Sequence, residues 1–229
     1  MLHAPSLERT TRLAGLATLA VALSPPVDAR ADATLAAHMV QHVALTMVAA
    51  PLLAAGLPRL ARVVHPVVAW LLIAATGWLV HFTGLFEAAT EHVPVHALEH
   101  ALLFGTALLF WAQVVGPPAS AAGPGGRLSH PVRLLYLVVA MPQNTFLALA
   151  ISSSSRVLYP HYAAGRDALG DQRLAGGIMW VAGDLVLLAA VLLVAAAWAR
   201  HEERENLIRE AGEASGAPAD RRPSPRTTG

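Results

Sequence analysis

The sequence predicts an all-α fold, a polytopic bundle of transmembrane helices, and three observations support this prediction. Hydrophobic residues make up 55% of the 229-residue chain and charged residues only 14%, whereas a soluble domain carries about 25% charged residues. The mean hydropathy is +0.50. Five apolar segments reach the roughly 17–25 residues that a helix needs to cross a bilayer. These five strong spans cover residues 38–57, 63–86, 95–115, 131–152 and 174–199.

A sixth apolar segment, "LAGLATLAVAL" (13–23), is shorter and precedes the strong spans. It follows Arg9 and Arg12, and residues 31–33 have the form A-x-A. A charged start, a short apolar core and such an end are typical of a secretory signal peptide. The alternative is a weak first span. Residues 1–33 are therefore expected to form either a signal peptide or a short first span.

Turn-forming residues separate the later spans. Residues 116–127, "GPPASAAGPGGR", divide the third strong span from the fourth. We expect a transmembrane domain over residues 34–200. Residues 201–229 are polar and carry both charge signs, which predicts a largely disordered tail whose first part can extend the last helix.

The distribution of arginine predicts the orientation of the chain. With the N-terminus inside, the inner segments hold twelve arginines and the outer segments four, and cytoplasmic loops are generally the arginine-rich ones. The C-terminal tail is then cytoplasmic as well.

Charge and cysteine content exclude several classes of function. The net charge is +1 at pH 7, and no basic stripe or RNA-binding signature indicates a nucleic-acid partner. Cysteine is absent, which excludes disulfides, thiolate zinc sites and cysteine catalysis. Soft-metal chemistry in this chain must therefore use His, Met or carboxylate ligands.

The stretch "EHVPVHALEH" (91–100) places three histidines four residues apart at the start of the third strong span. Since positions i and i+4 share one face of a helix, His96 and His100 form a one-face pair. Pro94 suits the first turn of a helix and leaves His92 in the preceding loop.

Two further spans place histidines at the same level. His38 and His42 form a second one-face pair at the start of the first strong span. His42, His81 and His100 each lie roughly 6–9 Å below the predicted outer boundary. Ionisable groups inside spans are costly and tend to be functional, so we predict a metal or cofactor site at the outer face.

The histidine pattern is compatible with several chemistries. "HALEH" fits the H-x-x-E-H pattern of some zinc peptidases, but Glu99 points about 100° away from His100 around a helix. A bis-His haem between His42 and His100 is a second alternative. Copper is a third, because Cu(I) is bound by His and Met, and Met39 follows His38.

Asp184 lies near mid-membrane in the last strong span. A carboxyl group at that depth is a functional candidate. The simpler interpretation is a structural hydrogen bond to Gln143 or Asn144. Gly176, Gly177 and Gly183 on the same span indicate a helix-packing face.

Three blocks of the sequence together resemble the CtaG family, the polytopic caa3-type cytochrome c oxidase assembly factors. The first is "HMVQHVALTMVAAPLLAAGLP" (38–58) and the second is "VHALEHALLFGTALLFW" (95–111). The third consists of "LYPHYA" (158–163) followed by "DQRLAGGIMWVAGD" (171–184). The matching positions are His38, Met39, Gln41, His42, His96, Glu99, His100, Asp171, Gln172, Met179 and Trp180.

The resemblance implies a bacterial plasma-membrane protein that assembles haem-copper oxidase by handling copper and is not itself an enzyme. Oxidase subunits and membrane lipids would be its partners. On this basis we expect His42, His96 and His100 to be metal ligands, with His38, His81 and Met39 as further candidates. Glu99, Asp171 and Gln41 would orient the imidazoles by hydrogen bonds to the ring N–H that does not bind the metal. The alternatives are a bis-His haem redox protein, a membrane zinc peptidase and a purely structural assembly scaffold.

Overall fold

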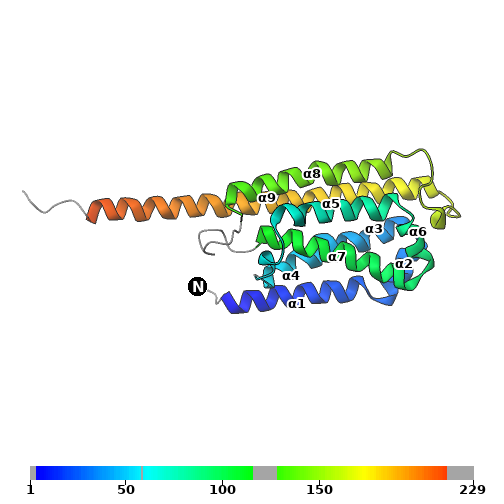
Figure 1. Ribbon diagram of the computed structural model, residues 1–229, viewed down its shortest axis with the longest axis horizontal. Helices are drawn as coiled ribbons and strands as arrows, with labels where there is room; N and C mark the ends of the chain where they lie inside the picture. Colours follow the sequence, from blue (N-terminus) through cyan, green and yellow to red (C-terminus); the bar gives the residue numbers. More distant parts are fainter. Residues whose placement is uncertain (1–3, 58, 116–127, 216–229) are drawn as a thin grey trace, which may run out of the picture.

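A computed structural model describes residues 4–57, 59–115 and 128–215, and within these ranges the regular elements are all helical. Figure 1 shows an elongated bundle of helices lying side by side, with the last helix projecting far beyond one end. Four helices are long and apolar enough to cross a membrane, or five if one bent pair forms a single span. The predicted all-α transmembrane bundle is therefore confirmed.

The N-terminal segment folds onto the bundle as two helices. Helix α1 (Ala4–Ala22) packs against the part of the first strong span that follows His42. The approach is close, since a Cβ on Gly15 would lie 2.6 Å from the Leu53 side chain. Helix α2 (Pro25–Ala33) follows and packs against α3. The amide of Gln41 fastens this corner by donating to the Ala22 carbonyl at 2.9 Å.

The first strong span runs from Leu35 to Gly56 and changes its helical geometry partway. Helix α3 (Leu35–Val43) passes into a π-helical turn (Ala44–Ala49) and then into α4 (Ala50–Gly56). Pro51 supplies no N–H to the helical ladder, and the Thr46 carbonyl instead accepts a hydrogen bond from Trp111 Nε1 at 2.8 Å. Such π turns often lie near functional sites, and this one begins two residues after His42.

The predicted span 63–86 is not one straight helix. It divides into α5 (Pro66–Phe82) and α6 (Leu85–Glu91), which meet at 65°. At the break, Thr83 is extended, and its hydroxyl donates to the Leu79 carbonyl and accepts from the Leu85 N–H. Side-chain bonds of this kind compete with the helical ladder, and they turn α6 across the end of the bundle (Figure 1).

The remaining spans match their predicted positions more closely. Helix α7 (Val93–Val115) and helix α8 (His130–Ser152) each cross the bundle. Helix α9 (Ala168–Ser215) is far longer than the predicted span, because the first part of the polar tail continues it. Residues 216–229 and the predicted connector at 116–127 lie outside the described residues.

Helices α8 and α9 approach each other closely through the predicted glycine face. A Cβ on Gly176 would lie 2.8 Å from the Ala148 carbonyl oxygen, and one on Gly183 would lie 2.7 Å from Asn144 Nδ2. The backbone contact at Gly176 leaves no room for a side chain, and a side chain at Gly183 would displace Asn144, so the prediction of a packing face holds for these two glycines. The prediction is wrong for Gly177, which faces open space and takes no part in the contact.

The end of the bundle that carries α2, α6 and the loop before α9 contains its own buried core. This end, called the α2–α6 end below, lies to the right in Figure 1. A cluster of apolar side chains fills it, including Leu35, Met39, Phe86, Tyr159 and Tyr162. A second apolar cluster around Phe110, Trp111, Leu137 and Leu187 fills the opposite half. The histidine pairs lie in the first of these regions.

Candidate metal centre

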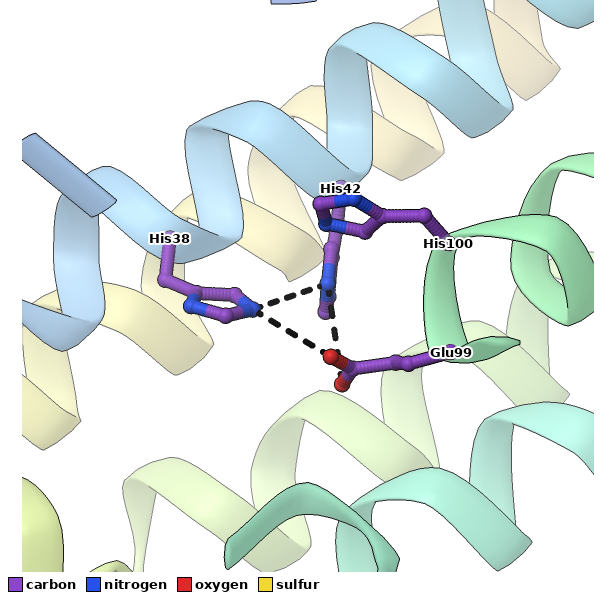
Figure 2. Close-up of side chains that lie close together, drawn as sticks. All are labelled: His38, His42, Glu99 and His100. Atoms are coloured by element: carbon purple, nitrogen blue, oxygen red, sulfur yellow. Dashed lines mark hydrogen bonds and ion pairs between the residues drawn. The ribbon is translucent and has the colours of Figure 1, made fainter. Parts of the chain in front are cut away.

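Helices α3 and α7 bring four buried side chains together at the α2–α6 end. His38, His42, Glu99 and His100 each offer a ligand atom, and these atoms all lie within 4.8 Å of one another. Figure 2 shows the α3 histidines facing Glu99 and His100 across the gap between the two helices. All four are buried, and Glu99 is 0% exposed. Among the described residues, this group can hold a metal ion.

Helical spacing explains how these side chains converge. His38 and His42 are one turn apart and share a face of α3, as predicted. Glu99 and His100 are adjacent on α7. Both side chains reach the group because they project to either side of the face that α7 turns toward α3. Phe86 from α6 covers the α3 pair, with its ring centroid 4.9 Å from that of His38 and 6.4 Å from that of His42. The bend after α5 therefore closes the site against water.

The distances within the group suit shared coordination. The Nε2 atoms of His38 and His42 are 3.0 Å apart. Two imidazole nitrogens that each lie about 2 Å from one ion are separated by about 3 Å when the angle at the ion is close to a right angle. The Glu99 carboxylate lies 3.8 Å from His38 Nε2 and 3.7 Å from His42 Nε2.

Several polar atoms of the group are buried without a hydrogen-bond partner among the described residues. They include both carboxylate oxygens of Glu99, His42 Nδ1 and His100 Nε2. An isolated buried carboxylate is costly unless it is paired or binds a metal. The donor set, three imidazoles and one carboxylate, suits a divalent or monovalent transition metal. The residues present therefore fit a metal ion on grounds of both geometry and polarity.

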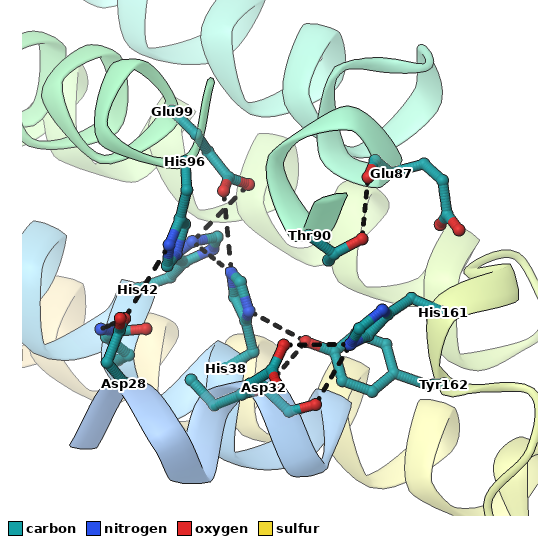
Figure 3. Close-up of polar contacts among 12 residues, drawn as sticks. Asp28, Asp32, His38, His42, Glu87, Thr90, His96, Glu99, His161 and Tyr162 are labelled. Carbon is teal, nitrogen blue, oxygen red and sulfur yellow. Dashed lines mark hydrogen bonds and ion pairs between the residues drawn. The ribbon is translucent and has the colours of Figure 1, made fainter. Parts of the chain in front are cut away.

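Tyr162 determines which nitrogen of His38 faces the group. Burial raises the pKa of the Tyr162 phenol, which therefore keeps its proton and donates it to the Ala31 carbonyl at 2.8 Å. The phenol oxygen must then accept the hydrogen bond from His38 Nδ1 at 3.0 Å. In the neutral imidazole this arrangement places the proton on Nδ1 and leaves Nε2 unprotonated, so that Nε2 accepts the hydrogen bond from His42 Nε2 at 3.0 Å. Figure 3 shows this chain from Tyr162 to His38.

The other predicted ligands lie beside the group. The His81 ring is 6.1 Å from that of His42, and its Nδ1 donates to the Gly77 carbonyl at 2.8 Å. The His96 ring is 4.2 Å from that of His100, but its side chain is 22% exposed and turns toward Asp28. Met39 is fully buried in the apolar cluster that surrounds the site. His92 is exposed between α6 and α7, where the sequence predicted a loop.

The three predicted supporting residues act in different ways. Glu99 belongs to the group of possible ligands itself. Asp171 accepts from the backbone N–H groups of Leu35 and Ala36 at 2.7 and 3.1 Å, so it holds the start of α3 against α9. Gln41 donates to the Ala22 carbonyl and to Asp28. The hydrogen bonds that Asp171 and Gln41 form thus position α3, whereas the sequence predicted that they would orient imidazoles directly.

Asp184 lies away from this group and has partners of its own. Its carboxylate accepts from Asn144 Nδ2 at 3.0 Å and from the Thr145 hydroxyl at 2.7 Å. The hydrogen bond to Asn144 was the simpler interpretation of this residue, and it is confirmed. Asp184 joins α9 to α8 beside the Gly183 contact.

Sequence reasoning missed three contributors to the site, namely Tyr162, Phe86 and Asp28. Tyr162 lies in the block "LYPHYA", which pointed to the family but carried no spacing that linked it to His38. Phe86 looked like an ordinary apolar residue of a span. Asp28 lay in a segment that also fitted a signal peptide.

The fold and the site together define a polytopic membrane protein with a buried His/Glu group that can hold a metal ion. The chain belongs to the cytochrome c oxidase caa3 assembly factor family, whose model matches residues 3–201. This match confirms the family suggested by the three sequence blocks.

Curated relatives occur in mycobacteria. The chain is 27% identical over 230 residues to uncharacterized proteins of Mycobacterium bovis and Mycobacterium tuberculosis, covering 84% of this chain and 34% of each relative. It is 28% identical over 150 residues to an uncharacterized protein of Mycobacterium leprae, covering 61% of this chain and 22% of that relative. The chain thus spans about a third or less of the length of these relatives. No solved structure matches it.

Proposed function

We propose that this protein binds copper as cargo at the buried His/Glu group and supplies it to haem-copper oxidase during assembly, without catalysing a reaction of its own. The observation that carries the proposal is the Glu99 carboxylate. It is fully buried among three imidazoles, and its oxygens lack a hydrogen-bond partner among the described residues. A positively charged ion is the simplest partner for such a group.

The proposed ligands are His38, His42, His100 and Glu99. This set revises the sequence prediction, because it brings Glu99 among the ligands and moves His96 and His81 to the periphery. Met39 remains a candidate only through its position beside His38 in the chain. The choice of copper rests on the family and on imidazole donors, which suit copper as well as zinc, iron or nickel.

Residues around the four ligands would keep the site ready to bind copper. Tyr162 keeps the proton of His38 on Nδ1, so that Nε2 is unprotonated and can bind the ion. Phe86 excludes water, and Asp171 and Gln41 hold α3 in register with its neighbours. A copper ion bound there would supply no chemistry beyond its own transfer.

The geometry supports copper handling better than the two enzymatic or redox alternatives. A haem iron needs a macrocycle between two axial imidazoles, whereas here a third imidazole and a carboxylate lie within the same 4.8 Å. A zinc peptidase of the H-x-x-E-H type would use His96 and His100 together and keep Glu99 for water. Instead, Glu99 and His100 face the α3 pair, and His96 turns outward.

We further propose that the α2–α6 end faces the periplasm and that both termini are cytoplasmic in the bacterial plasma membrane, as arginine placement predicts. In this arrangement residues 4–33 stay attached to the bundle as helices α1 and α2. Their contacts support this, since Ala31 anchors Tyr162 and Asp28 contacts Gln41. Oxidase subunits would meet the protein within the membrane or at this end.

The test is the metal content of the purified full-length protein together with its optical spectrum. We expect about one copper per chain and no Soret band. The double variant His38→Ala plus His42→Ala should lose the copper and fail to mature the oxidase. His201→Ala is the control, because His201 lies at the opposite end and pairs with Glu205. Undiminished copper and oxidase maturation in the double variant would refute the proposal.

A further inference from the structure

A cavity lies between the candidate metal centre and the surface of the α2–α6 end. Its volume is about 330 Å³. Residues of α2, α3, α6 and α7 and of the loop before α9 line it, and three carboxylates and two histidines are among them. The residues that matter here are Asp28, Asp32, Glu91, His38, His96 and Tyr162. Figure 3 shows the contact between Asp28 and His96 and, beside it, the contacts of His38 and His42 with Glu99.

His96 lies between the cavity and the buried group. Its ring centroid is 4.2 Å from that of His100 and 5.6 Å from that of His38. At 22% exposure its side chain is more accessible than those of His38 and Glu99, which are 4% and 0% exposed. His38 and His96 both line the cavity, and His96 is the more accessible of the two, with its other face toward His100.

The two nitrogens of His96 have different surroundings. Nδ1 is 3.9 Å from the Asp28 carboxylate, and Nε2 is buried with no hydrogen-bond partner among the described residues. A carboxylate beside one ring nitrogen favours the proton on that nitrogen and leaves the other unprotonated. Nε2 of His96 is thus a free imidazole donor next to the metal centre.

We infer that His96 is a transfer ligand, through which copper passes between the carboxylate-lined cavity and the buried group of His38, His42, Glu99 and His100. This inference rests on the proposed function and adds the route by which that site is filled and emptied. Copper is first attracted by the carboxylates of the cavity. It then gains a bond to His96 Nε2 while losing one to a cavity ligand, and next gains His100 or His38 while losing His96.

Stepwise exchange explains how a closed site can still exchange its cargo. An ion entering a group covered by Phe86 would otherwise have to lose all its outer ligands before gaining new ones. A donor that touches both sides lowers this barrier in both directions equally, so it changes rates and leaves the equilibrium affinity unchanged. A resident ligand would instead change the affinity.

The experiment measures copper loading and release by the full-length protein in detergent. Anaerobic stopped-flow mixing with Cu(I) held by a chromophoric chelator follows both directions. We expect His96→Ala and His96→Gln to slow loading and release alike, by at least about tenfold, with the same final occupancy as the unaltered protein. His92→Ala is the matched control, because His92 lies one turn earlier, is exposed and does not line the cavity.

The cavity carboxylates offer an independent readout. Asp28→Asn keeps an oxygen for the hydrogen bond from Gln41 but removes the charge beside His96. It should slow loading and weaken the dependence of the loading rate on salt.

The outcomes separate the two proposals. An affinity loss in both His96 variants as large as that of His42→Ala would overturn the inference by making His96 a resident ligand. Unchanged rates in folded His96 variants would also overturn it. If the unaltered protein binds no copper, the proposed function itself fails. Size-exclusion elution and helical circular dichroism establish folding, and His96→Gln carries the test if His96→Ala is unstable.

Discussion

Glu99 and Asp184 are both carboxylates on membrane-spanning helices of this protein, and their surroundings are opposite. Asp184 on α9 accepts hydrogen bonds from Asn144 and Thr145 on α8. Glu99 on α7 is fully buried, lies near three imidazoles and has no hydrogen-bond partner among the described residues. Asp184 is thus part of a helix contact, whereas Glu99 faces imidazoles at 3.7–3.8 Å without a hydrogen bond, and we propose that a metal ion is its partner.

This difference shows how an ionisable residue in a span can be interpreted. A polar group that is costly in a membrane is retained either because neighbours satisfy it or because a ligand does. Counting intramembrane carboxylates cannot separate the two cases, but counting their hydrogen-bond donors can. The contrast between Glu99 and Asp184 can be tested directly by substitution.

The largest effect is expected at Glu99. The variant Glu99→Met should weaken copper binding at least about 100-fold, because removing one partner of a buried charge pair costs about 3–5 kcal/mol. The metal-free variant should unfold at the same temperature as the unaltered protein or higher, since an apolar side chain replaces an unpartnered polar one. Copper titration and thermal unfolding of the metal-free proteins measure both quantities. A less stable metal-free variant with normal copper affinity would make Glu99 structural, like Asp184.

An intermediate effect is expected at Tyr162, which touches the metal centre without contributing charge. Tyr162→Phe removes the acceptor that holds the proton on His38 Nδ1, and copper affinity should fall by about 10-fold. Tyr159→Phe is the matched control, because the Tyr159 hydroxyl is buried in the same apolar cluster and has no hydrogen-bond partner among the described residues. Equal affinities for the two variants would contradict the assigned tautomer.

The smallest effect is expected at Asp184, and it should appear in stability alone. Asp184→Ala removes two hydrogen bonds between α8 and α9, and such bonds in membranes contribute about 0.6 kcal/mol each on average. Unfolding in mixed micelles should show a loss of about 1 kcal/mol, with copper affinity unchanged. Asp184→Asn retains part of the bonding and should lose less. Reduced copper affinity in a stably folded Asp184→Ala would remove the distinction between the two carboxylates.

Much of the fold could be predicted from local patterns in the chain. Apolar length located the membrane helices, and the four-residue spacing of His38 with His42 placed both on one face. Pro94 correctly predicted that His92 lies before α7. The break after Phe82 was not predictable from apolar length, because it depends on the hydrogen bonds of the Thr83 hydroxyl.

The sequence by itself determined the all-α class, the family and the histidines that can reach one level of the bundle. These properties follow from composition, motif and helical period, which are local to each segment. Only the tertiary structure decided that Glu99 faces the α3 histidines, that Tyr162 orients His38 and that Asp184 is satisfied by α8. Those outcomes depend on which helices become neighbours. The number of hydrogen-bond donors around a buried carboxylate is set by residues far away in the chain, and no local pattern records it.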